Sequence, residues 1–281
     1  MRGDTFRFGW RRLATLLMLL MGSAPALAAD TFITVASTTS TQNSGLFEYL
    51  LPVFTEKTGI EVRVIAVGTG QAIKLAENGD ADLLLVHDRA GEMKFLRQGY
   101  GINRREVMYN DYVIVGPSSD PAAVRGLRNA AAAFRRIAGA GSSFVSRGDD
   151  SGTNRQELRL WQAAGIDAKA ASGTWYKEVG AGMGATLNTA AGMDAYTLTD
   201  RATWVAFKNR ASLELLVEGD QRLFNQYAVI EINPAVHPSV KSAEAKAFAD
   251  WLVSREGQAV IGAFVVDGQV LFHPNAGVTE R

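Results

Sequence analysis

The chain has 281 residues, no cysteine, and 29 basic and 29 acidic side chains, giving a formal net charge of zero. This balance provides no broad basic field for nucleic acid or an acidic membrane, and three histidines without cysteine argue against a zinc site. Without disulfides, the mature chain must be stabilised by its apolar core. Its expected length of roughly 250 residues is enough for one large domain or two of ordinary size.

The first residues have the pattern of a secretory signal peptide. Several arginines precede an apolar run from Leu13 to Met21, which is too short to span a bilayer. Ala26-Leu27-Ala28 then offers an A-x-A cleavage site, so we expect residues 1–29 to be removed, with cleavage near Ala28 or Ala29. The alternative is an uncleaved anchor. No cysteine follows the site to carry a lipid, so we expect a freely soluble periplasmic monomer.

Strands and helices alternate over the first hundred residues. Residues 31–36 and 61–67 have the β-branched, alternating pattern of strands, and 81–86 is a continuous apolar run typical of a buried parallel strand. Helices are expected over 46–54, 72–78 and 90–98. This βαβαβ order predicts an α/β domain.

Two turns of this region have features of anion-binding sites. Residues 37–45 are rich in hydroxyl and amide side chains, which suit a strand-to-helix turn better than a helix interior. Gly68-Thr69-Gly70 also follows a strand and opens a helix, although the third glycine of a dinucleotide fingerprint is missing. A polar surface loop and a plain βα connection are the alternatives.

His87 and Asp88 follow the third strand, at the end where open α/β sheets bind ligands. Because Asp88 also precedes a helix, we expect its carboxylate to cap that helix. The next strand, 109–117, is expected to lead out of the first lobe, and the segment from Pro121 to Gly139 is expected to be helical.

A third helix start follows the apolar pair Phe144-Val145. It reads Ser146-Arg147-Gly148-Asp149-Asp150-Ser151-Gly152-Thr153, and a helix is expected from Asn154. Hydroxyls cap a helix start, its free N–H groups attract anions, and Arg147 adds a fork suited to oxyanions. The alternative is an ordinary capped loop in which Arg147 pairs with Asp149 or Asp150.

The remaining elements complete a mixed α/β pattern. Residues 185–193 are expected to be helical, 194–200 form a strand, turn and helix cap, 213–217 and 227–232 are strands, and 243–253 and 256–263 are helices. Three helix starts of glycine, serine and threonine form a constellation, and two lobes closing on a small anion would let them converge.

These motifs resemble the periplasmic tungstate-binding proteins of ABC importers, the TupA type, over essentially the whole mature chain. The most specific matches are Ala36-Ser37-Thr38-Thr39-Ser40-Thr41 with Asn43-Ser44-Gly45, where Ser37 replaces the family's first threonine, Val67-Gly68-Thr69-Gly70-Gln71-Ala72, Leu85-Val86-His87, Ser146 to Thr153, and Tyr196-Thr197-Leu198-Thr199-Asp200-Arg201.

The resemblance implies an α/β periplasmic binding protein fold of type II, with a ligand cleft between two hinged lobes. We expect lobe 1 to comprise residues 30–112 and 228–281, and lobe 2 residues 113–227. The ligand-binding residues it implies are Thr38, Thr39, Ser40, Thr69, Arg147, Ser151, Gly152, Thr153 and Thr197. It also implies an ABC permease and its ATPase as partners, no cofactor, and tungsten bound only as an oxyanion.

Other ligands and functions stay open at this point. Molybdate or phosphate could occupy the same fold; phosphate would gain from a carboxylate acceptor because it keeps a proton at neutral pH, and Asp88, Asp149 and Asp150 are near enough to supply one. An exported hydrolase with Ser40 or Ser151 as nucleophile would need a base and an orienting group, yet only His87 lies near a motif and no G-x-S-x-G elbow is present. An organic ligand should show more aromatic lining than Trp175 and Tyr176.

Overall fold

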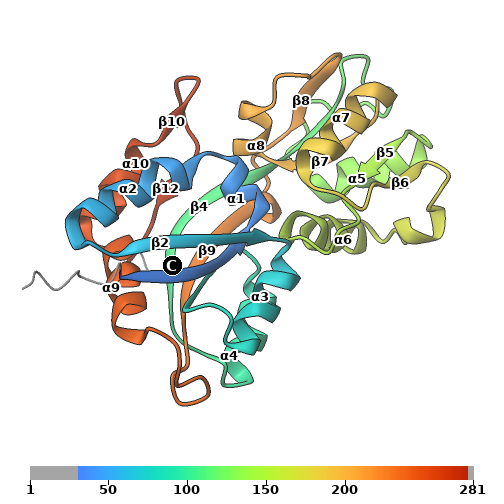
Figure 1. The fold of residues 1–281 in the computed structure, drawn as a ribbon. Coiled ribbons are helices and arrows are strands. Elements are labelled where there is room, and N and C mark those ends of the chain that lie inside the picture. The colour runs from blue at the N-terminus through green and yellow to red at the C-terminus, as the bar shows by residue number, and fades with distance from the viewer. Residues whose placement is uncertain (1–30, 278–281) are drawn as a thin grey trace, which may run out of the picture.

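The computed structural model describes residues 31–277 and shows two lobes joined by two long strands (Figure 1). The ten α-helices of this part of the chain are α1 (Thr39–Asn43), α2 (Leu46–Thr58), α3 (Thr69–Asn78), α4 (Arg89–Arg97), α5 (Ala130–Gly139), α6 (Gly152–Ala164), α7 (Met183–Met193), α8 (Arg201–Ala206), α9 (Ser242–Val253) and α10 (Arg255–Ala263). Two short 3₁₀ turns, Ala168–Ala171 and Gln221–Leu223, accompany them. The expected signal peptide lies outside the described residues.

The strands are mostly short, apart from the two that link the lobes. They are β1 (Phe32–Thr38), β2 (Glu61–Val67), β3 (Leu83–Val86), β4 (Gly101–Pro117), β5 (Phe144–Ser146), β6 (Tyr176–Glu178), β7 (Thr197–Asp200), β8 (Leu213–Val217), β9 (Phe224–Ile232), β10 (Val265–Val266), β11 (Gln269–Val270) and β12 (His273–Pro274).

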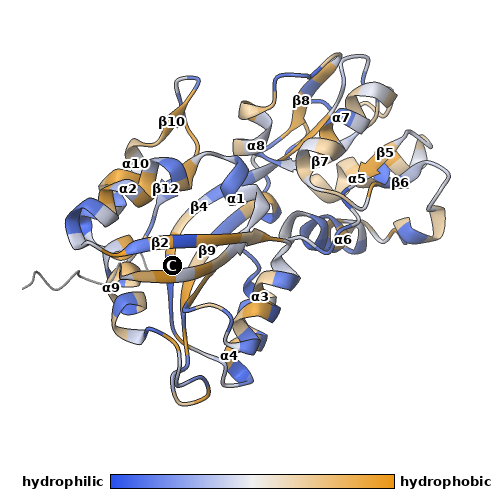
Figure 2. Ribbon diagram, viewed as in Figure 1, coloured by the Kyte–Doolittle hydropathy of each residue, from blue (hydrophilic) through white to orange (hydrophobic). Residues whose placement is uncertain are grey.

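The first lobe is built on a mixed sheet of order β2-β1-β3-β9-β4-β12. β1 pairs in parallel with β2 and β3, whereas β9 runs antiparallel to both β3 and β4. All four residues of β3 are buried, as its continuous apolar sequence predicted, because helices cover both faces of the sheet (Figures 1 and 2). The α/β two-lobe fold expected from the sequence is confirmed.

The second lobe is assembled around the far end of β4. β7 and β8 pair there with β4, and β5 and β6 form a separate two-stranded parallel sheet. Its aromatic core is centred on Trp161, whose ring lies 4.2 Å from that of Phe134 and 5.0 Å from that of Phe144, centroid to centroid. Each lobe thus has its own apolar core, with Phe54, Phe95 and Phe248 in the first and Trp161 in the second.

The strands β4 and β9 connect the lobes, and the proposed boundaries at 112/113 and 227/228 fall within these two strands. The boundaries themselves stay a prediction. Among residues 31–277, no helix is long and apolar enough to cross a membrane.

Two local expectations were wrong. The polar run after β1 contains a short helix, α1, because the Thr38 hydroxyl accepts from the Thr41 N–H and so caps one turn. The segment 121–129 is not helical: α5 begins only at Ala130, where the Asn129 side chain caps the helix by accepting from Ala132 N at 2.9 Å.

Candidate anion site between the lobes

The first helix start, after β1, brings three hydroxyls together in lobe 1. Thr38 Oγ1 lies 3.1 Å from Ser40 Oγ and 2.8 Å from Thr41 Oγ1, and all three side chains are buried. Thr39, between them, is half-buried and lines a cavity of about 370 Å³ that also contacts lobe 2. Ser37, the departure from the family pattern, donates to Leu85 O at 2.7 Å and so stabilises the sheet.

His87 forms a hydrogen bond with Ser40. Its Nε2 lies 3.3 Å from Ser40 Oγ, and its Nδ1 lies 3.1 Å from the Tyr112 hydroxyl and 3.0 Å from Asn225 Oδ1. Burial lowers the pKa of His87 to about 4, so the imidazole is neutral at pH 7. Since Asn225 Nδ2 donates to Asn110 Oδ1, the Asn225 Oδ1 accepts the Nδ1 proton, and Nε2 accepts from the Ser40 hydroxyl.

This Ser–His–Asn arrangement has the outline of a hydrolytic triad but not its chemistry. A histidine with a pKa of about 4 is a weak base at neutral pH, and Asn225 supplies no charge to stabilise an imidazolium. The Ser40 side chain is also only 3% exposed. The geometry therefore makes Ser40 a fixed polar group rather than an activated nucleophile.

The second and third helix starts meet across the cleft. Gly68 precedes α3 and Ser151 precedes α6, and the Gly152 N–H donates to Thr69 Oγ1 at 2.8 Å. A Cβ on Gly152 would lie 2.6 Å from His87 Cε1, so only glycine permits this approach. The convergence predicted from the sequence is therefore present, with one helix-start N–H used by the opposite lobe.

Arg147 supplies the guanidinium that lines the cavity between the helix starts. It is only 2% exposed; its Nη2 donates to Asp149 Oδ2 at 2.6 Å, and its Nε has no hydrogen-bond partner among the described residues. Asp149 also accepts from Ser151 N at 3.2 Å, so the carboxylate fixes the guanidinium to the start of α6. Asp150 pairs instead with Arg155, at 2.8 Å.

The other predicted residues of lobe 2 differ in what they offer. Ser151 Oγ accepts from Asn154 N at 3.2 Å and keeps its own proton to donate. Thr153 Oγ1 is buried near the Tyr112 hydroxyl, but it makes no hydrogen bond with that group or with any other in residues 31–277. Thr197 donates to Val145 O at 2.7 Å, which ties β7 to β5, so a contact with an anion remains a prediction for it.

A buried carboxylate supports the loop that carries Arg147. Glu157 of α6 accepts from Ser146 Oγ at 2.7 Å, Tyr176 OH at 2.7 Å and Trp161 Nε1 at 3.0 Å. Burial raises its pKa to about 7, although these donors oppose the rise. Glu157 thereby joins β5, β6 and α6 through Ser146, the residue that precedes Arg147.

The structure brings to the site three groups that the sequence did not predict as part of it, although Asp200 was correctly predicted as a helix cap. Burial raises the pKa of Asp200, a carboxylate close enough to Arg147 to feel its charge, and both its oxygens accept from Thr203. Tyr112 comes from the linking strand, and Gly180, Ala181 and Gly182 line the cavity with Thr39 and Arg147. Only the last group left a signal, a glycine-rich turn before a helix like the three already identified.

Asp88 does not cap α4, contrary to expectation. It occupies the cap position, but its carboxylate makes no capping hydrogen bond and contacts Arg155 and Arg159 of lobe 2 instead. Of the three carboxylates proposed as acceptors for a protonated ligand, each already accepts hydrogen bonds from protein donors.

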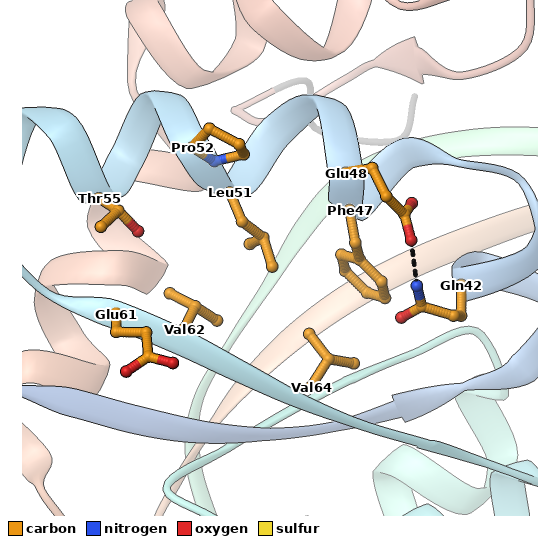
Figure 3. A pocket seen from close by; sticks show the side chains of 9 residues that line it. All are labelled: Gln42, Phe47, Glu48, Leu51, Pro52, Thr55, Glu61, Val62 and Val64. Atoms are coloured by element: carbon orange, nitrogen blue, oxygen red, sulfur yellow. Dashed lines mark hydrogen bonds between the residues drawn. The ribbon is translucent and has the colours of Figure 1, made fainter.

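A second groove, of about 430 Å³, lies between α2 and β2 on the outside of lobe 1 (Figure 3). Leu51, Val62 and Val64 give it an apolar lining, and its Gln42 and Glu48 side chains bond to each other. No arginine is among its lining residues, and only Gln42 comes from one of the three helix-start segments. No group of three or more acidic or histidine side chains in the described part of the chain is arranged to hold a metal ion.

Comparison with known proteins gives this fold and site a class. A family model described as a PBP superfamily domain matches residues 23–256, and the chain belongs to that superfamily of binding proteins. The tungstate-binding protein TupA of Peptoclostridium acidaminophilum is 44% identical over 91% of this chain and 90% of its own length. The protein belongs to the TupA family.

Solved structures agree with this placement. The tungstate-binding protein TupA of Desulfovibrio alaskensis is 46% identical, with a TM-score of 0.76, over 88% of this chain and 99% of that one. A tungstate ABC transporter protein of Geobacter sulfurreducens is also 46% identical, with a TM-score of 0.76, over 84% of this chain and all of that one.

Proposed function

We propose that this protein is a periplasmic substrate-binding protein that captures tungstate and delivers it to an ABC permease driven by its ATPase. The proposal rests on Arg147, a buried guanidinium with an unpartnered Nε, which lies where the helix starts of the two lobes converge. Its relatives are transport proteins, and the role is binding rather than catalysis.

The donors around Arg147 suit a fully ionised oxyanion. Hydroxyls of Thr38, Thr69, Ser151 and Thr153 are neutral donors, and so are those first-turn N–H groups of α1 and α6 that do not already donate to Thr38, Thr69 or Ser151. Neutral donors bind a dianion without a matching set of cations. Arg147 supplies the formal charge, moderated by its bond to Asp149. Thr39, Ser40 and Gly152 complete the proposed site, with Thr197 at its edge.

The carboxylates favour tungstate or molybdate over phosphate. A phosphate that keeps a proton would need an acceptor. However, Asp88 and Asp150 already accept hydrogen bonds from Arg155, and Asp149 accepts from Arg147. The preference for tungstate over molybdate comes from the relatives, whose names specify tungstate.

Location follows from the same family. Binding proteins of ABC importers work outside the inner membrane, and we propose that residues 1–29 are the signal peptide that exports this chain.

Calorimetric titration of the mature protein with tungstate, molybdate, sulfate and phosphate tests the proposal. We expect tight binding of tungstate, weaker binding of molybdate and no heat from the other two. A preference for phosphate would replace the ligand while keeping the site, and no binding of any of the four would overturn the oxyanion function.

Arg147→Ala locates the site. Hydrogen bonds to a charged group contribute about 1.5–3 kcal/mol each, so we expect tungstate affinity to fall at least tenfold. Arg147→Lys keeps the charge but loses the planar guanidinium with its paired donors. Its tungstate affinity should therefore lie between those of wild type and Arg147→Ala. Arg128→Ala, an exposed arginine of the same lobe, is the matched control and should bind as wild type. Unchanged affinity in Arg147→Ala, with the melting temperature preserved, would place the anion elsewhere.

A further inference from the structure

A cluster of charges joins the lobes beside the proposed anion site. Asp88, at the start of α4 in lobe 1, accepts from Arg155 Nη1 at 2.7 Å and from Arg159 Nη2. Both arginines belong to α6 in lobe 2. Four positions apart on one helix, they lie on the same face and direct two guanidinium groups at one carboxylate.

The Asp88 carboxylate bonds to the two arginines of lobe 2 and not to its own helix. The Asp88 side chain is 2% exposed, and it makes no capping hydrogen bond to α4 although it occupies the cap position. An aspartate there would normally accept from an N–H of its own helix, so the orientation observed sacrifices a local hydrogen bond for one across the cleft. Its partners hold the pKa of the carboxyl below its ordinary value against the opposing effect of burial.

Two glycines of lobe 1 leave room for this cluster. A Cβ on Gly70 would collide with Asp150 Oδ2 and lie 2.6 Å from Arg155 Nη2, both in lobe 2. A Cβ on Gly91 would lie 2.8 Å from Asp88 Oδ2 in its own lobe and 3.4 Å from Arg155 Nη1. Side chains at these positions would collide with the charged groups, so the backbones of α3 and α4 are shaped around the arginines.

The same elements carry the proposed anion donors. α6 begins with Gly152 and Thr153, and Asp88 directly follows His87, which positions Ser40. We infer that Asp88 is a positioning residue that latches lobe 1 to lobe 2 through Arg155 and Arg159, and thereby sets how long the bound anion is retained. This inference rests on the proposed function, but the contact itself does not involve the anion.

Stopped-flow and calorimetric measurements on Asp88→Asn test the latch. We expect the dissociation rate of tungstate to rise about tenfold and the association rate to stay within twofold, because the anion enters before the lobes close. Glu214→Gln is the control, since it removes from Arg125 a carboxylate of the same lobe and neither residue lines the cavity. It should leave both rates within about twofold of wild type. Equal effects of the two variants, or no change in Asp88→Asn, would overturn the latch.

A double-mutant cycle with Arg159→Ala separates the latch from a general loss of stability. The Nη2 of Arg159 contacts Asp88, and its Nη1 contacts only Gln156 of its own helix turn among the described residues. Asp88→Asn and Arg159→Ala should therefore be non-additive, with the double variant no faster to release tungstate than Asp88→Asn. Full additivity would contradict a direct contact.

The distance between the lobes provides a readout that does not depend on tungstate. The chain has no cysteine, so Glu56→Cys and Arg135→Cys, on exposed positions of α2 and α5, would carry the only two spin labels. Without any anion, Asp88→Asn should shift the distance distribution toward longer separations and Glu214→Gln should not. If the distances behave so but no oxyanion binds, the latch stands and the proposed function fails. An unchanged distribution in Asp88→Asn would refute the latch alone.

Discussion

His87 illustrates how a buried polar residue at this site is stabilised. Both ring nitrogens have partners, namely Ser40 on one side and Tyr112 with Asn225 on the other, so the neutral ring is satisfied without solvent. Charging the ring would add a second cation near Arg147, whose charge already lowers the pKa of His87. The neutral ring therefore accepts from the Ser40 hydroxyl and holds it in place.

This gives a pH-dependent stability. The folded-state pKa of about 4 is below the ordinary histidine value of 6.5, so the unfolded chain binds more protons between these values and stability falls as the pH drops through them. From pH 7 to pH 5, wild type should lose about 2 kcal/mol more than His87→Gln. Denaturant unfolding at both pH values measures the difference. Glu92 and Glu157, whose pKa values are raised to about 7, titrate in both proteins and cancel. Parallel pH profiles would refute a buried neutral His87.

Gly152 is a second position where one atom matters. The Cβ of Gly152→Ala would meet His87 Cε1 at 2.6 Å and Thr69 Oγ1 at 3.0 Å, so the lobes could not approach fully. We expect at least a tenfold loss of tungstate affinity in calorimetry, with lobe 2 still folded. Gly184→Ala, in α7 with open space around its Cβ, is the control and should bind normally. Wild-type affinity in Gly152→Ala would show that the observed approach of the lobes is not needed for binding.

Elements were predicted well where a local pattern decides them. β3 was recognised from an unbroken apolar run, and α6 from its Ser151 cap and the apolar residues that follow. The errors arose where tertiary partners decide. Asp88 has the sequence of a cap but not its hydrogen bond, because two arginines 67 and 71 positions later compete for it. The alanines on both sides of Asn129 favour helix locally, but residues 121–128, which include Pro121 and Gly126, form turns.

The start of α5 offers a test at the scale of one element. Asn129 Oδ1 accepts from Ala132 N at 2.9 Å, so Asn129→Ala should lower the free energy of unfolding by about 1 kcal/mol. Chemical denaturation measures this loss, and tungstate binding should be unaffected because α5 carries none of the proposed donors. If the segment from Pro121 were helical in solution, Asn129 would lie inside the helix and Asn129→Ala would instead stabilise it.

The candidate site could be predicted only in part at the level of the whole molecule. The three helix starts are visible in the sequence because each is a local strand–turn–helix pattern. Their meeting, for example the bond from Gly152 N to Thr69 Oγ1 between residues 83 positions apart, depends on how two lobes are oriented. Tyr112 and Asp200 were missed because neither has a local signature of a binding residue.

Ligand binding should stabilise both lobes together. A ligand that binds only the folded state, present at 100 times its dissociation constant, adds about 2.7 kcal/mol to the free energy of unfolding. We expect tungstate to raise the midpoint of thermal unfolding measurably, and Arg147→Ala to lose this shift at the same concentration. Calorimetric scans with and without the anion measure it; a shift retained in Arg147→Ala would contradict the proposed site.

The position of β9 in the sheet also has a consequence for the order of folding. β9 lies between β3 and β4, so Asn225 bonds to His87 although 138 residues separate them. As the chain emerges, the sheet of lobe 1 therefore has an open edge on β3 until β9 has emerged, at Ile232 of 281 residues. Lobe 2, residues 113–227 by the proposed boundaries, is contiguous in sequence and needs no later segment for its core. The slow step in folding should therefore be the insertion of β9 between β3 and β4.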